Sequence, residues 1–180
     1  MDSLFSHRSV TRLGLAATIA VLLAILLPAC TPALDWREYR FDAGGFAVMF
    51  PQKPGRAEKK LATPAGEVTM KMVSVQIGET VFGAASAEFD APPDLATQDA
   101  MRDALLKNFA GNVIVDQPVN AGALLGREVI KRGNSAAGDV ELRARFFVRG
   151  KRYYQIAAAG RQGAVQEADL DLFLTSFKPD

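Results

Sequence analysis

The chain has 180 residues, 49% of them hydrophobic, which is enough apolar material for one compact domain. Its 21 Lys and Arg residues nearly balance 20 Asp and Glu residues. This balance argues against nucleic acid as a partner, because phosphate binding normally requires a clear basic excess. The one cysteine excludes an intrachain disulfide and a cysteine-rich metal site.

The N-terminal segment has the pattern of an export signal. Residues 1–12 carry Arg8 and Arg12, and residues 13–27 contain no charge. As a helix with a rise of about 1.5 Å per residue, this apolar run would span roughly 23 Å, which is short of the ~30 Å hydrocarbon core of a membrane. The sequence therefore predicts a signal peptide over residues 1–29 rather than a permanent membrane span.

The apolar run ends in a motif that resembles the lipobox of bacterial lipoproteins. Leu27-Pro28-Ala29-Cys30 places an apolar residue three positions before the cysteine and a small residue directly before it. The resemblance implies cleavage before Cys30, attachment of diacylglycerol to its sulfur and a lipidated tether over residues 30–35. Two or more acyl chains hold a protein stably at a membrane. The alternative is cleavage after Ala33, which would discard Cys30 and release the protein.

The same resemblance indicates a location. Thr31 follows Cys30, in place of the Asp that tends to retain Gram-negative lipoproteins in the inner membrane. We therefore expect an exported protein of the cell envelope that is attached to the membrane through Cys30. The periplasmic face of the outer membrane is the expected site.

Several catalytic chemistries are excluded by what the mature chain would lack. Removal of residues 1–29 takes away His7, the only histidine. Ser-His-Asp catalysis, Cys-His catalysis and histidine-ligated zinc are then impossible, and a lipidated Cys30 supplies no free thiolate. We expect no catalytic residue, no metal and no cofactor, and thus a protein that is not an enzyme.

Carboxylates are the remaining candidates for acid–base work. Asp99 and Asp103 lie four residues apart on a predicted helix, but Arg102 lies between them. This pattern is typical of a solvated helix face. A phosphate-binding loop is also excluded, because Gly150-Lys151 lacks the upstream glycine and the downstream Ser or Thr of that motif.

Residues 36–180 are predicted to form a single α+β domain with a mainly antiparallel sheet. Alternating and continuous apolar runs between turn residues predict the strands, and apolar spacing of three and four predicts two helices. The expected strands are residues 36–41, 46–50, 58–61, 67–77, 81–89, 113–119, 124–132, 139–149 and 151–159, and the expected helices are residues 94–110 and 164–177.

Apolar residues occupy both faces of the strand at residues 67–77, so we expect a sheet that is covered on both sides. Strand alternation also predicts which side chains lie inward. The residues expected to meet in one core are Phe46, Val48, Phe50, Phe146 and Val148.

Short motifs spread over most of residues 39–178 carry a family resemblance. They are Gly44-Gly45-Phe46-Ala47-Val48-Met49-Phe50-Pro51, residues 63–68, Gly126-Arg127-Glu128, residues 145–155 and Phe173-Leu174-Thr175-Ser176-Phe177. In this order they resemble the PsbP-like superfamily of α/β/α sandwiches, which includes bacterial envelope lipoproteins of unknown function. The resemblance implies a six- or seven-stranded antiparallel sheet with helices on both faces, and an assembly, accessory or binding role.

A basic stretch is the candidate binding feature. Residues 125–161 contain nine basic and three acidic side chains. Several guanidinium groups share one face of the strand at residues 139–149. Two interpretations stay open: a solvated face that pairs with acidic helices, or an anion or partner site. The residues of that site would be Arg143, Arg145, Arg149 and Arg152.

The leading hypothesis is a non-catalytic, lipid-anchored envelope protein that binds a protein partner or assists complex assembly. The alternatives are a carrier of an anionic or apolar small molecule and a carboxylate-dependent enzyme that acts on envelope polymers. A partner-binding module should expose an apolar or charged patch, and a carrier should enclose an apolar cavity. An enzyme should place two carboxylates about 5–9 Å apart in a cleft.

Overall fold

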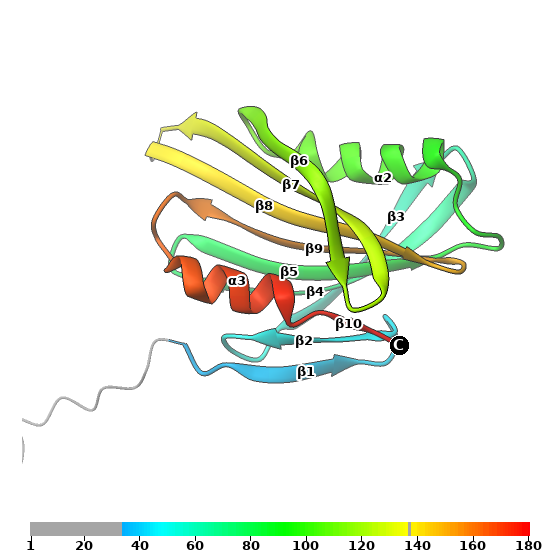
Figure 1. The fold of residues 1–180 in the computed structure, drawn as a ribbon, viewed down its shortest axis with the longest axis horizontal. Helices are drawn as coiled ribbons and strands as arrows, with labels where there is room; N and C mark the ends of the chain where they lie inside the picture. The colour runs from blue at the N-terminus through cyan, green and yellow to red at the C-terminus, as the bar shows by residue number, and fades with distance from the viewer. Residues whose placement is uncertain (1–33, 137) are drawn as a thin grey trace, which may run out of the picture. The chain divides into compact units, whose positions relative to one another are not determined.

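Seven antiparallel strands form the larger of two β-sheets in the computed structural model, which describes residues 34–136 and 138–180 (Figure 1). The strand order is β3-β4-β5-β9-β8-β7-β6. The strands are β3 Gly55–Thr63, β4 Gly66–Ile77, β5 Thr80–Glu88, β6 Asn112–Ala121, β7 Leu124–Ser135, β8 Gly138–Arg149 and β9 Arg152–Arg161. The predicted α+β fold with a mainly antiparallel sheet is confirmed, and the sheet has seven strands.

A second, three-stranded sheet joins two distant parts of the chain. β1 (Arg37–Phe41) and β10 (Lys178–Pro179) flank β2 (Phe46–Phe50), and both pairings are antiparallel. The β1–β2 turn is closed by the carbonyl of Phe41, which accepts hydrogen bonds from the amides of Gly44 and Gly45, each at 2.9 Å. Gly45 has a φ of 68°, a conformation that glycine adopts without steric cost.

Two helices complete the described part of the chain. α2 (Leu95–Leu106) begins after Asp94, whose carboxylate accepts a 2.8 Å hydrogen bond from the Thr97 amide. α3 (Glu167–Thr175) is shorter than the helix predicted over residues 164–177. The reason is a turn before it, in which the Ala164 amide donates to the Arg161 carbonyl at 3.1 Å.

Each face of the seven-stranded sheet carries its own core. The first core lies between this sheet, α3 and the three-stranded sheet, and it is rich in aromatic rings. Its buried residues include Phe46, Val48, Phe50, Phe82, Phe147, Tyr154, Phe173 and Phe177. The second core lies on the face that carries α2 and includes Met70, Met101, Val129, Leu142, Phe146 and Tyr153. In Figure 1, α2 and the β1–β2 pair lie on opposite sides of the large sheet.

The two cores correct one prediction. Phe46, Val48 and Phe50 belong to the first core, whereas Phe146 and Val148 belong to the second. The strand alternation within β8 was correct, since Phe146 is buried. The alternation could not show which core the apolar side of β8 faces. That side faces α2, and the first core receives Phe147 from the other side of the same strand.

Candidate functional site

The four arginines of the predicted binding site lie on the sheet face that α3 and β10 cover. Two of them are mostly buried: the side chains of Arg143 and Arg145 are 14% and 12% exposed. Arg143 pairs with Glu141 on its own strand and with Glu167 on α3. Arg145 pairs with Glu128 of β7 at 2.8 Å and donates a 3.2 Å hydrogen bond to the Leu174 carbonyl.

These contacts fix α3 at both ends. Glu167 lies in the first turn of the helix, and the Leu174 carbonyl lies in its last turn. Carbonyls at the end of a helix lack partners within the helix and carry partial negative charge, so a guanidinium group there is favourable. Arg143 and Arg145 therefore attach α3 to β8.

The carboxylates under α3 are shifted toward the charged state. Burial raises the pKa of Glu141, but hydrogen bonds and charges from Arg143 and Arg132 outweigh it and hold the pKa below its usual value. Glu128 follows the same pattern, because Gln117 and Arg145 donate hydrogen bonds to it and its pKa is lowered in spite of burial. Both carboxylates already have cationic partners within the fold.

The other two arginines lie near the three-stranded sheet. Arg149 donates a 3.3 Å hydrogen bond to the Pro179 carbonyl of β10. Arg152 pairs with Glu88 of β5, and this pairing is the main reason that the pKa of Arg152 is raised. The structure thus places the four predicted residues on one face but distributes them among separate contacts. Their role as an anion or partner site stays a prediction.

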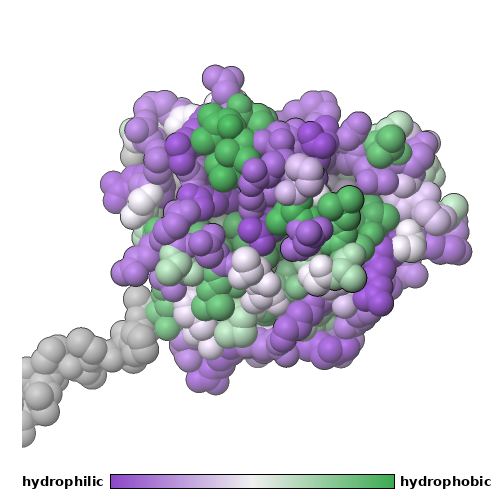
Figure 2. Space-filling view, viewed as in Figure 1, coloured by the Kyte–Doolittle hydropathy of each residue, from purple (hydrophilic) through white to green (hydrophobic). Residues whose placement is uncertain are grey.

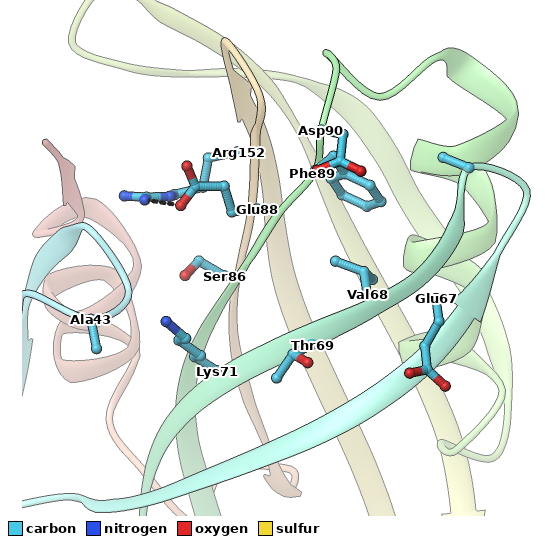
Figure 3. A pocket seen from close by; sticks show the side chains of 11 residues that line it. Ala43, Glu67, Val68, Thr69, Lys71, Ser86, Glu88, Phe89, Asp90 and Arg152 are labelled. Carbon is cyan, nitrogen blue, oxygen red and sulfur yellow. Dashed lines mark hydrogen bonds and ion pairs between the residues drawn. The ribbon is translucent and has the colours of Figure 1, made fainter.

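A polar hollow of about 270 Å³ lies beside Arg152 (Figure 3). Lys71 extends from β4 toward Ser86 and the Glu88–Arg152 pair. The charged residues of the lining are Glu67, Glu88, Asp90, Lys71 and Arg152. Three carboxylates against two cations give no positive excess, so the lining does not favour an anion.

A second hollow, which we term the α2 groove, lies where α2 leaves the ends of β7 and β8 uncovered. Its volume is about 270 Å³. The lining combines apolar side chains with charged ones from opposite walls. The residues are Leu95, Gln98, Asp99 and Arg102 of α2, Leu125, Gly126 and Arg127 of β7, Phe146, Phe147 and Val148 of β8, and Tyr153 of β9.

Tyr153 is the unusual residue of the α2 groove. Its side chain is buried, and its hydroxyl group has no hydrogen-bond partner within residues 34–136 and 138–180. Burial is the main reason that the pKa of this hydroxyl group lies far above its ordinary value of 10.0, so the group stays protonated and can donate. Most buried polar groups in proteins have a partner, so this hydroxyl group and the side-chain oxygen of Gln155 are exceptions among the described residues.

Sequence reasoning did not identify Tyr153 as a site residue, although the signal was present. β8 and β9 pair through a tight hairpin, in which Tyr153 is opposite Val148. Cross-strand partners lie on the same face of a sheet, so the predicted hairpin at Gly150-Lys151 already placed Tyr153 beside Val148. Only the position of α2 shows that the hydroxyl group is buried without a partner.

The acidic pair predicted as a solvated helix face lies in such a face. Asp99 and Asp103 are 57% and 53% exposed, and both carboxylates lie within ion-pair distance of Arg102, at 3.1 and 3.7 Å.

In the part of the chain that the structure describes, no three His, Cys, Asp or Glu side chains cluster in a way that could hold a metal ion. Residues 34–136 and 138–180 also include no helix that is long and apolar enough to span a membrane. Cys30 and the signal peptide predicted over residues 1–29 lie outside the described residues.

Comparison with solved structures gives a likeness of fold. No family model matches the chain, and no curated protein matches it. A crystal structure of a protein from Bacteroides thetaiotaomicron VPI-5482 superposes with a TM-score of 0.50 and 10% sequence identity. The match covers 80% of this chain and 48% of the other, so the chain spans about half the length of that protein. At this identity the likeness concerns the fold alone.

Proposed function

We propose that the protein is a non-catalytic, lipid-anchored protein of the cell envelope that binds another protein. The observation that carries the proposal is the pair of leucines that flank the α2 groove. Leu95 is 76% exposed and Leu125 is 67% exposed, the highest values among the large hydrophobic residues described as exposed. Apolar side chains around a polar-rimmed hollow are typical of surfaces that bind other proteins.

Other exposed apolar side chains lie on the same domain. Val113 and Ile114, at the start of the edge strand β6, are about half exposed. Figure 2 shows hydrophobic residues in separate groups at the surface, divided by polar ones. A bulge between Val113 and Val115, and Pro118 within the strand, interrupt the pairing edge of β6. These features discourage strand addition, so the α2 groove is the better candidate surface.

The size of the α2 groove and of the polar hollow makes either a poor pocket for a carrier, whereas a third hollow of about 420 Å³, lined by Leu124, Arg149 and Phe177 among others, keeps the carrier as an alternative. The α2 groove and the polar hollow measure about 270 Å³ each. Pockets that bury a small-molecule ligand usually measure roughly 300–1,000 Å³ and are largely apolar. A protein surface that inserts one side chain requires less space.

We propose an α/β/α sandwich of the PsbP-like type, supported by Met101 of α2 in one core and Phe173 of α3 in the other. An experimental structure with either helix away from its core would contradict it.

Two measurements test the proposed function. Photo-crosslinkers placed in cells at several exposed positions, among them Leu125, Leu172 and Val81, should capture an envelope protein from at least one position. Capture from none of them would contradict partner binding.

The anchoring is tested separately at Cys30. Because the lipobox-like motif predicts acylation of the Cys30 sulfur, Cys30→Ser should abolish incorporation of a fatty-acid probe. Fluorescence of the labelled protein on a gel measures it, with Ser176→Ala, a substitution far along the chain from the motif, as the control. Equal labelling of the Cys30→Ser variant and the wild type would contradict the lipid anchor.

A further inference from the structure

The third hollow lies where the turn between β6 and β7 meets β10. Figure 1 shows this turn beside β10, although the two segments are far apart in the sequence. The hollow has a volume of about 420 Å³, within the range of roughly 300–1,000 Å³ that is usual for pockets of small-molecule ligands. Its lining includes Ala121, Leu124, Arg149, Phe177, Lys178 and Pro179.

The apolar part of the third hollow is supported from behind by the first core. Phe177 is buried, and its ring stacks on that of Phe147 with 5.5 Å between centroids and an angle of 14°. Ala121 and Leu124 are half-buried and pack against the same core. Because these side chains are held by the fold, the apolar wall exists before a ligand arrives.

The lining also contains two cations, Arg149 and Lys178, and no carboxylate. Lys178 donates a 2.5 Å hydrogen bond to Glu38 of β1, so its charge is already paired. Arg149 is exposed and donates a 3.3 Å hydrogen bond to the Pro179 carbonyl. It forms no ion pair with a carboxylate in residues 34–136 and 138–180.

Arg149 differs in this respect from the other arginines of the predicted site. Arg143, Arg145 and Arg152 each pair with a glutamate. The side chain of Asp180, next to Pro179, is held by Arg40 at 2.8 Å. A guanidinium group has five N–H donors in a planar fork that matches anionic oxygen atoms. Arg149 therefore keeps donors and a charge that a ligand can use.

We propose that the third hollow binds a small amphiphilic anion. Its apolar chain or ring lies against Leu124 and Phe177, and its anionic head group pairs with Arg149. One unpaired cation beside one apolar wall is complementary to a molecule with a single charge next to an apolar group. A membrane surface, in contrast, is recognised by clusters of 4–8 basic residues. The inference goes beyond the proposed function and does not depend on the α2 groove.

Titration of the purified full-length chain with octanoate tests the proposal, and 1-octanol is the uncharged counterpart. Calorimetry should show tighter binding of octanoate than of 1-octanol. Arg149→Gln should weaken octanoate binding about tenfold and leave 1-octanol binding unchanged, and Arg149→Lys should retain most of the affinity. No binding of octanoate, or equal affinity of the wild type and Arg149→Gln, would overturn the inference.

A matched control separates the hollow from general attraction by charge. Lys151 is exposed, lies two residues from Arg149 in the same hairpin and does not line the hollow. Lys151→Gln removes the same charge and should bind octanoate as the wild type does. An equal loss for Lys151→Gln and Arg149→Gln would assign the effect to the net charge of the hairpin and overturn the inference.

A second variant tests the apolar wall. Leu124→Ala removes part of the wall and keeps Arg149, so it should weaken octanoate and 1-octanol by the same factor, about fivefold. Circular dichroism checks that the variant is folded. Unchanged affinity of a folded Leu124→Ala variant for both compounds would place the binding elsewhere and overturn the inference.

Vesicles distinguish a free amphiphile from a membrane surface. The full-length Cys30→Ser variant, which lacks the predicted acylation site, should sediment with phosphatidylglycerol vesicles to the same extent with and without Arg149→Gln. Sedimentation that Arg149→Gln abolishes would assign Arg149 to lipid head groups in a membrane and overturn the inference. None of these results changes the crosslinking test of the proposed function.

Discussion

The two faces of the seven-stranded sheet differ in how completely their buried polar groups are paired. Under α3, four charged side chains form a paired set in which Arg143 and Arg145 meet Glu141 and Glu128. Under α2, Tyr153 is buried with no partner among the described residues. Satisfied polar groups need no further partner, whereas an unsatisfied buried group needs an explanation, and a ligand is one of those available. The difference distinguishes a structural face from a candidate binding face.

The largest expected effect concerns aromatic packing in the first core. Phe173 is fully buried, and its ring centroid lies 5.3 Å from that of Phe50 and 5.2 Å from that of Phe82. We expect Phe173→Ala to lower the free energy of unfolding by about 4 kcal/mol. Urea denaturation measures it, and Leu172→Ala, at an exposed neighbour, is the control.

Phe146→Ala gives the corresponding loss of stability in the second core, on the other face of the sheet. Phe146 is buried but borders the α2 groove, so fewer neighbours lose contact. The expected loss is about 3 kcal/mol, the lower end of the range for a buried phenylalanine. A Phe146→Ala loss larger than that of Phe173→Ala, in the same urea experiment, would contradict the comparison.

The next effect concerns the paired charges under α3. Glu141 is 8% exposed and has two cationic partners, Arg132 and Arg143. We expect Glu141→Gln to lower the free energy of unfolding by about 2 kcal/mol. This loss is smaller than for a fully buried pair, because Arg143 keeps Glu167 as a partner and Arg132 is partly solvated. Glu67→Gln, at the exposed pair with Lys60, should cost no more than about 0.5 kcal/mol. Similar losses for the two variants in thermal or urea unfolding would show that the Glu141 network stabilises the protein no more than an exposed ion pair does.

The same carboxylates predict how stability depends on pH. The pKa values of Glu128 and Glu141 are lowered in the folded protein from the ordinary value of 4.5. Below that value the unfolded state binds more protons, so their contribution is complete above about pH 5 and falls as the pH drops further. A Glu128→Gln and Glu141→Gln double variant should lose less stability between pH 6 and pH 3 than the wild type. An identical pH profile in urea denaturation would contradict this prediction.

The smallest expected effect is a difference in stability between variants of two adjacent tyrosines, Tyr153 and Tyr154, which lie on opposite faces of the sheet. Tyr154→Phe removes a 3.2 Å hydrogen bond to the Gly45 carbonyl and should cost about 1 kcal/mol. Tyr153→Phe removes an unpartnered hydroxyl group, so stability should stay equal or rise by up to about 1 kcal/mol. Matched thermal unfolding of the two variants measures the difference. A clear loss for Tyr153→Phe would mean that its hydroxyl group has an acceptor.

Local patterns predicted much of the fold. The alternation of residues 67–77 gave the correct faces of β4, with Val68 and Met70 in the second core and Val73 in the first. The helix start at Asp94 was also predictable, because its carboxylate caps the Thr97 amide three residues away. β10 was missed, since a strand of two residues that includes Pro179 has no periodicity.

The candidate site was less predictable, because charges were counted along the chain rather than across it. Arg145 is opposite Glu128 on the neighbouring strand, and Arg143 meets Glu167 on α3. A basic excess within one stretch therefore overstated the free positive charge of that face. The missed residue, Tyr153, becomes notable only through the absence of an acceptor within the described residues, which depends on how α2 packs over the sheet.

The pairing of β2 with both β1 and β10 has a consequence for the order of folding. β1 is a close neighbour of β2 in the sequence, but Lys178 and Pro179 pair with Ala47 and Phe46 across nearly the whole described chain. Closing so large a loop is entropically costly, and contacts between distant segments slow folding. The hairpins β3–β4, β6–β7 and β8–β9 consist of short-range contacts and can form first. We therefore expect the pairing of β10 with β2 to form late, after the large sheet, so that the aromatic core is closed last.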